Sequence, residues 1–240
     1  MNPAPNTTSS PLSKLPAITL WFWVMKVAAT TLGETLGDFL SKGPEHGGIN
    51  LGYGLASVLV LAIFFATLIP QILSRRYLPF LYWAVILSTS TAGTTMSDFM
   101  DRTLGLGYAK GTAILVTLLI AALVIWRLVE GSISVSTVRT RRAELFYWLA
   151  ILASNTLGTA LGDYLADEEQ GPGLGFMGGA ILIGSIIALI AIIYVVARRL
   201  KLLGVTLTVA LFWAAFVLTR PFGGLCSNRC VPGGRSGGVE

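Results

Sequence analysis

The sequence predicts an all-α, polytopic integral membrane protein with about seven transmembrane helices in parallel internal repeats. Of the 240 residues, 54% are hydrophobic and 12% are charged, whereas soluble domains carry about 25% charged residues. Uncharged apolar runs at 51–74 and 174–197 reach the roughly 20 residues that a membrane-spanning helix needs. A nine-residue motif also recurs along the chain at intervals of about 60–65 residues, which is typical of a repeat architecture.

The motif ends in an acidic residue in three of its four copies. The copies occupy 30–38, 90–98, 155–163 and 220–228, and their last residues are Asp38, Asp98, Asp163 and Asn228. An aromatic pair precedes every copy, at 22–23, 82–83, 147–148 and 212–213. Because all four copies keep one register, we expect the function to lie where the copies meet.

The apolar segments predict helices over 18–40, 51–74, 80–100, 107–129, 144–165, 174–197 and 203–225. The first, third, fifth and seventh contain the motif and are called the motif helices below. Each intervening helix returns the chain across the membrane, so the motif helices run in one direction. The expected division is a polar tail (1–17), a transmembrane domain (18–227) with repeats 18–78, 79–143, 144–202 and a partial 203–227, and a Gly/Arg-rich tail (228–240).

The charges alternate between connections. Lys and Arg concentrate at 75–76, 127–142 and 198–201, whereas Asp and Glu lie mainly near 45, 101 and 167–169. Since positive loops stay in the cytoplasm, we expect a cytoplasmic N-terminus and an external C-terminus. This bias accounts for the pI of about 9.4, so the lipid bilayer is the expected partner and nucleic acid is not.

Each motif helix is expected to present a polar stripe. At 100° per residue, Asp38, Glu34 and Thr31 fall within one arc, and the other copies repeat the pattern. Carboxylate, hydroxyl and amide oxygens suit hard cations, and carboxylates also exchange protons. The expected ion- or proton-binding residues are Glu34, Asp38, Asp98, Asp163, Thr31, Thr91, Thr156 and Asn155, with Lys26 and Arg220 as charge partners.

A second interpretation of the carboxylates stays open. The three Asp residues could instead end their helices in solvent at the membrane surface. Four carboxylates against two cations leave a formal charge of −2, which suits a divalent cation or proton exchange, and the identity of a metal stays open.

Glycines at small-x3-small spacing predict close helix packing. They are Gly33, Gly37, Gly93, Gly158, Gly162 and Gly223.

An aromatic-Trp pair followed by Thr-x-Gly-x3-Gly-Asp resembles a bacterial family of uncharacterised membrane-anchored proteins built from a repeat of unknown function. The resemblance covers about 15–227 and implies the repeated membrane fold in a bacterial cytoplasmic membrane. It implies no activity. The fourth copy departs from the pattern, because it begins with Arg220-Pro221 but has Ser227-Asn228 where the family has Gly-Asp.

The leading functional hypothesis is a membrane transporter or channel for a small cation. The hypothesis includes divalent cations and proton-coupled transport. A non-catalytic assembly or interaction protein, with a homo-oligomer among its forms, is the alternative. An intramembrane acid/base enzyme would need two carboxyl groups that share a proton, and three equivalent Asp residues favour a ring over such a pair. We therefore expect no enzyme activity and no cofactor. Cys226 and Cys230 lie at the expected external end, where a disulfide is permitted.

Overall fold

The computed structural model describes residues 15–74, 76–135 and 138–226, and the backbone of 227–230. Within these residues the chain is all α-helical, as predicted. The helices are α1 (Leu20–Ser41), α2 (Tyr53–Leu73), α3 (Pro79–Asp98), α4 (Gly107–Glu130), α5 (Arg141–Ala166), α6 (Gly175–Arg199) and α7 (Val205–Cys230), with the short helices η1 (Pro44–His46) and η2 (Phe99–Thr103). Most of both predicted tails lies outside the described residues.

Local chemistry at the helix ends explains where the helices begin. The Thr19 hydroxyl accepts a hydrogen bond from the backbone N–H of Phe22 at 3.4 Å. Thr140 caps α5 in the same way, through Ala143 N at 3.0 Å, so α5 begins before the predicted Glu144. Such hydroxyl caps satisfy N–H groups that have no partner within the helix.

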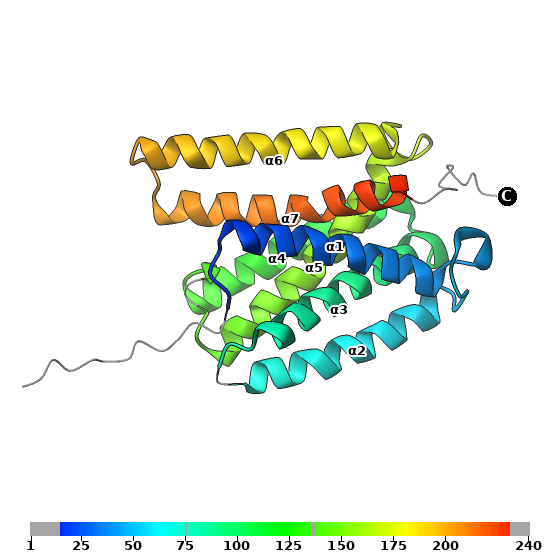
Figure 1. Ribbon diagram of the computed structural model, residues 1–240, viewed down its shortest axis with the longest axis horizontal. Helices are drawn as coiled ribbons and strands as arrows, with labels where there is room; N and C mark the ends of the chain where they lie inside the picture. Colours follow the sequence, from blue (N-terminus) through cyan, green and yellow to red (C-terminus); the bar gives the residue numbers. More distant parts are fainter. Residues whose placement is uncertain (1–14, 75, 136–137, 231–240) are drawn as a thin grey trace, which may run out of the picture.

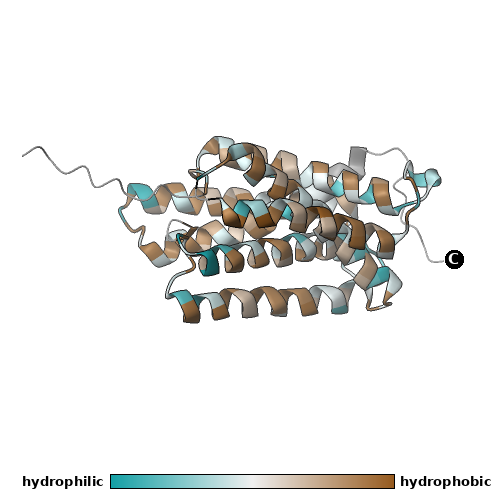
Figure 2. Cartoon of the chain, turned by 90° about the horizontal axis from the view of Figure 1, so that it is seen from below, coloured by the Kyte–Doolittle hydropathy of each residue, from teal (hydrophilic) through white to brown (hydrophobic). Residues whose placement is uncertain are grey.

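Five of the helices are long and apolar enough to cross a membrane: α2, α4, α5, α6 and the 205–226 part of α7. The other two, α1 and α3, have 22 and 20 residues and carry many of the polar motif residues on buried faces. In Figure 2, hydrophobic residues run along the helices and hydrophilic residues gather mainly near their ends. The chain is therefore a polytopic membrane protein.

The four motif helices form a closed ring. Contacts join α1 to α3, α3 to α5, α5 to α7, and α7 back to α1 (Figure 1). Each intervening helix packs mainly on the motif helix that follows it, α2 on α3, α4 on α5 and α6 on α7. In the sequence, each repeat consists of a motif helix and the intervening helix after it. In the structure, an intervening helix pairs instead with the next motif helix. Among the described residues, no intervening helix covers α1 in this way, and Trp21 is 76% exposed.

The motif glycines set the register of the ring. The first glycine of each copy lies against the first motif residue of the next copy: Gly33 on Ser90, Gly93 on Asn155, Gly158 on Arg220 and Gly223 on Thr30. A Cβ added at Gly93 would lie 2.8 Å from the backbone carbonyl carbon of Asn155. Four equivalent contacts place the motif helices parallel, at one level and in backbone-to-backbone proximity.

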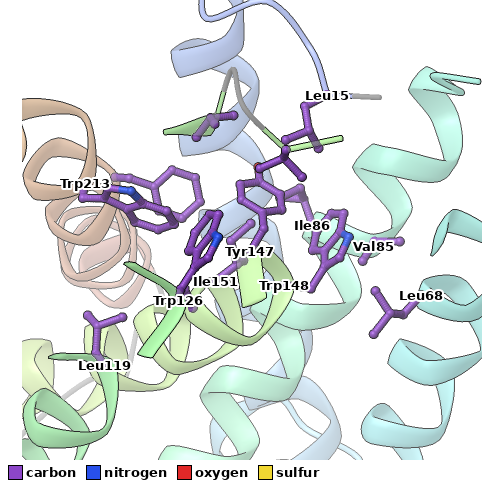
Figure 3. Packing of buried hydrophobic residues seen from close by; sticks show 14 of the residues in the cluster. Leu15, Leu68, Val85, Ile86, Leu119, Trp126, Tyr147, Trp148, Ile151 and Trp213 are labelled. Carbon is purple, nitrogen blue, oxygen red and sulfur yellow. The ribbon is translucent and has the colours of Figure 1, made fainter. Parts of the chain in front are cut away.

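The aromatic pairs fill one end of the ring, called the aromatic end below. Tyr82 and Tyr147 share a hydrogen bond between their hydroxyls at 2.7 Å. Trp126 from α4 packs edge-on against Tyr147 and Trp213 (Figure 3). The Trp213 indole donates to the carbonyl oxygen of Ile133 at 3.0 Å. The polar motif residues lie between this end and the opposite end, called the acidic end, where Asp38, Asp98 and Asp163 lie.

Candidate ion- or proton-binding site

Equivalent motif positions form layers across the ring. The arginine layer consists of the first motif residues, Thr30, Ser90, Asn155 and Arg220. One helical turn nearer the acidic end, the glutamate layer consists of Glu34, Thr94, Thr159 and Gly224. The aspartate layer follows, with Asp38, Asp98 and Asp163. Asn228, its fourth member, has a side chain outside the described residues.

Arg220 joins α7 to the other three motif helices. It is completely buried, and its guanidinium donates to the backbone carbonyl oxygens of Thr30 (2.7 Å), Ser90 (3.0 Å) and Asn155 (3.4 Å). These are the equivalent residues of the three other copies. A guanidinium offers five N–H donors in a rigid plane, which is why one side chain can satisfy three helices.

The Glu34 carboxylate receives its partners from three helices. Its Oε2 atom lies 2.8 Å from Arg220 Nη2, and the side chain is 3% exposed. The hydroxyls of Thr94 and Thr159 donate to the same oxygen at 3.1 and 3.3 Å. Both hydroxyls also accept from Arg220. A buried charge is tolerable when it is paired and hydrogen-bonded in this way.

A small pocket lies beside Glu34. Its lining comes from α1, α5 and α7: Glu34, Gly158, Thr159, Gly162, Asp163, Pro221, Gly224 and Leu225. The space holds about one water-sized sphere. The lining residues of α5 run from Gly158 to Asp163, so the pocket extends from the glutamate layer towards the aspartate layer. Glu34 is therefore a buried carboxylate next to a small space that is lined by glycine, Pro221 and Leu225 as well as by Thr159 and Asp163.

The aspartate layer is only partly exposed. Asp98 is 2% exposed and pairs with Arg102 at 3.3 Å, and its Oδ2 atom has no hydrogen-bond partner. Asp38 is half-buried and pairs with Lys42 at 2.7 Å. Asp163 is half-buried on the pocket wall. For Asp98, the interpretation of a solvated helix end is wrong.

Charged groups just beyond α1 and α3 extend this layer. Burial, helped by the charge of Asp98, raises the pKa of Asp101 to about 6, and the Ser97 hydroxyl donates to it at 3.4 Å. Burial acts to lower the pKa of Lys42, but the carboxylates of Asp38, Asp98 and Asp163 together outweigh it and the pKa rises. The acidic end thus contains ion pairs and, just beyond α3, the carboxyl of Asp101 with its raised pKa.

The neutral oxygen ligands expected from the sequence lie elsewhere. The hydroxyls of Thr91 and Thr156 donate to carbonyl oxygens of their own helices, Leu87 O at 3.0 Å and Leu152 O at 2.9 Å. Thr31 lies beside Gly223. The hydroxyls that reach Glu34 are instead those of Thr94 and Thr159. Thr94 and Thr159, about one turn further along α3 and α5, are not among the expected ligands, and the assignment of Thr31, Thr91, Thr156 and Asn155 as ligands stays a prediction.

Lys26 lies one turn from the arginine layer, towards the aromatic end. The side chain is completely buried, and its Nζ donates to Asn155 Oδ1 at 3.4 Å. The same atom lies 4.2 Å from the centre of the Phe216 ring. Among the described residues it forms no ion pair, so its environment differs from that of Arg220.

The sequence analysis missed several buried or paired charged groups. Lys42 and Arg102 lie four residues after Asp38 and Asp98 (i,i+4), a spacing that would have indicated their pairing. Glu144, in the first turn of α5, accepts from Gln71 Nε2 of α2 at 3.4 Å. No local signal indicates this contact, because it depends on how α2 packs.

No group of three or more His, Cys, Asp or Glu side chains in the described part of the chain is arranged to hold a metal ion. The expected Cys226–Cys230 pair involves a side chain outside the described residues. The geometry therefore offers oxygen atoms and an ion pair, without a clustered metal-ligand set among the side chains described.

Comparison with known families completes this description. A family model described as Repeat of Unknown Function (DUF347) matches residues 21–77, 81–132 and 146–200. These matches cover more than half of the chain. The chain belongs to this family. The matched segments contain the motifs of α1, α3 and α5, and the predicted resemblance to a repeat family of unknown function is confirmed. No curated protein and no solved structure matches the chain.

Proposed function

We propose that the protein transports protons or another small cation across the membrane, with the Glu34 carboxylate as the exchange site. The supporting observation is a carboxylate inside the ring that lines a small pocket and is balanced by one cation. Ionisable residues inside a membrane protein are costly and typically mark ion or proton pathways. The aspartates of the next layer would raise the local cation concentration at the acidic end.

The partners of Glu34 suit two states. With Glu34 ionised, Arg220 and two hydroxyls stabilise the carboxylate. With a proton or cation bound to Glu34, Arg220 retains the carbonyl oxygens of Thr30, Ser90 and Asn155. Without the Glu34 charge, Arg220 Nη2 still has the Ser90 carbonyl oxygen and the Thr94 and Thr159 hydroxyls as acceptors, so its hydrogen bonds persist although its charge is then unpaired.

The charges favour a proton or a monovalent cation over a divalent one. Arg220 neutralises Glu34, Lys42 pairs with Asp38, and Arg102 pairs with Asp98. A divalent site would need several uncompensated carboxylates around one position. An acid/base enzyme would need two carboxyl groups that share a proton, whereas Glu34 faces a guanidinium and two hydroxyls.

The test is cation flux into vesicles that contain the purified protein. Glu34→Gln keeps the shape and removes the exchangeable charge, so we expect uptake of H⁺, Na⁺ or K⁺ to fall at least tenfold. Glu45→Gln, at an exposed carboxylate of η1, is the matched control and should retain wild-type uptake. Unchanged flux in Glu34→Gln, or no flux of these ions in the wild type, would reject the proposal.

We also propose that the protein lies in a bacterial cytoplasmic membrane with a cytoplasmic N-terminus. The connections at the aromatic end contain Arg76 and Arg139, and Arg142 lies in the first turn of α5 at the same end, whereas Glu168 and Glu169 lie at the acidic end. This distribution supports the orientation through the positive-inside rule. It makes the acidic end external.

The orientation predicts which engineered cysteines are accessible. In a background with Cys226 and Cys230 replaced by serine, an impermeant thiol reagent should label Glu168→Cys in intact cells. It should label Arg139→Cys only after the cells are opened. Labelling of Arg139→Cys in intact cells would invert the orientation and place Glu34 nearer the cytoplasm.

A further inference from the structure

We propose that Lys26 is a second proton-binding site, on the aromatic side of Arg220, that exchanges protons in step with Glu34. This inference rests on the proposed function of Glu34. It adds the buried amine of Lys26, which takes no part in the exchange at Glu34, to the proton pathway. The proton is bound by the Nζ atom, as amine or ammonium.

The position of Lys26 suits a separate site. It lies eight residues before Glu34 on α1, which is about 12 Å along the helix. Arg220 and the rest of the arginine layer lie between the two levels. The pocket lined by Glu34 does not include Lys26. A proton on Lys26 is therefore on the far side of the guanidinium from the pocket.

The surroundings of Lys26 can accommodate both protonation states. Asn155 Oδ1 can accept a hydrogen bond from an amine or from an ammonium group. The Phe216 ring lies under the Nζ atom, and an aromatic face attracts a cation. No carboxylate among the described residues fixes the charge. Lysine differs here from arginine, because a buried ammonium can release its proton.

Unsatisfied polar atoms lie at the adjacent level. Asn155 Nδ2 and Ser90 Oγ are buried and have no hydrogen-bond partner, although both residues belong to the arginine layer. Buried polar atoms are normally paired, and exceptions are often found at functional places. Both atoms lie in the layer whose backbone carbonyl oxygens accept hydrogen bonds from Arg220. Asn155 Nδ2 and Ser90 Oγ are therefore unused hydrogen-bonding groups between Lys26 and the guanidinium.

Electrostatics couples the two sites. When the Glu34 carboxylic acid loses a proton and the Lys26 amine gains one, one O–H bond breaks, one N–H bond forms, and carboxylate plus ammonium result. The net charge of Glu34, Arg220 and Lys26 is the same before and after. Neutral Glu34 leaves Arg220 uncompensated, which disfavours a nearby ammonium, whereas ionised Glu34 compensates Arg220 and favours it.

The other groups around Lys26 introduce little competing charge. At the level of Lys26, α3, α5 and α7 contribute the uncharged Ile86, Ile151 and Phe216, and the adjacent arginine layer contributes Ser90, Asn155 and Arg220. One turn further towards the aromatic end, the Tyr82 and Tyr147 hydroxyls bind one another. Arg220 and Glu34 therefore dominate the electrostatic environment of Lys26.

The test compares proton flux into vesicles across variants. Lys26→Met removes the proton-binding group, and Lys26→Arg keeps a charge that holds its proton, so both should reduce flux at least tenfold. Lys110→Met, at an exposed position of α4, is the control and should retain wild-type flux. Wild-type flux in Lys26→Met together with loss in Glu34→Gln would overturn this inference and leave the proposed function standing. Wild-type flux in both would reject both.

A second measurement covers variants that do not fold. The chain has four other lysines, Lys14, Lys42, Lys110 and Lys201, and replacing them with arginine leaves one lysine to label with ¹³C. The Lys26 side-chain signal should change with pH between amine and ammonium positions, and the change should move to a different pH in Glu34→Gln. An ammonium signal that stays constant from about pH 5 to 9, across the range where coupled groups titrate, would overturn the inference.

Discussion

Replacing Arg220 with methionine is expected to lower the free energy of unfolding by about 3–5 kcal/mol, because it leaves Glu34 as a buried charge without a partner. The variant also deprives three backbone carbonyl oxygens of their donor. Thermal unfolding in detergent measures the effect. Arg102→Met is the matched control, and its partly exposed pair with Asp98 should contribute about 1 kcal/mol or less.

The double variant Glu34→Gln/Arg220→Met separates the ion pair from the packing. Removing both charges relieves the unpaired carboxylate, so the double variant should be more stable than Arg220→Met alone. Stability of Arg220→Met equal to that of the wild type would show that the guanidinium does not hold the ring together.

Gly93→Ala should be among the most damaging single-methyl changes in the ring. The new Cβ would lie 2.8 Å from the backbone carbon of Asn155 and from Thr156 N, and backbone atoms cannot rotate away. We expect a loss of about 3 kcal/mol, at the upper end of overpacking effects. At Gly178, in α6, the added methyl would meet only the Leu174 side chain, at 3.2 Å.

Gly178→Ala is therefore the matched control for Gly93→Ala. It gains the higher helix propensity of alanine, about 0.5–1 kcal/mol, and should unfold at or above the wild-type temperature. Equal unfolding temperatures for the two variants would contradict the close backbone contact between α3 and α5.

The helices could be predicted from the sequence because their signals are local. The segment 107–129 corresponds to Gly107–Glu130 almost residue for residue. Two differences also have local causes: Thr140 caps α5 earlier than expected, and the chain continues past Asp98 as a π-helical turn, Phe99–Thr103. The ring order could not be predicted in the same way, because it depends on contacts such as Gly223 with Thr30 between opposite ends of the chain.

The candidate site was harder to predict than the fold. Angular position alone groups Thr91 with Thr94 and Thr156 with Thr159 on neighbouring faces. Thr91 and Thr156 bind carbonyl oxygens of their own helices. Thr94 also lies 3.3 Å from the Ser90 carbonyl oxygen of its own helix, but Thr94 and Thr159 have the Glu34 carboxylate in reach as well. Side-chain hydroxyls often bind the preceding turn in this way, and the choice depends on whether an acceptor on another helix is in reach.

The closure of the ring by its first and last helices has a consequence for biosynthesis. Thr30 and Arg220, whose contact joins α1 to α7, are 190 residues apart in the chain. Because chains are made from the N-terminus, Glu34 enters the membrane long before its guanidinium partner exists. Until α7 is inserted, α1, α3 and α5 form an open arc. A chain truncated before α7 would keep α1 to α6 and yet offer no Arg220 to neutralise Glu34, so the ring is complete only once α7 has been made.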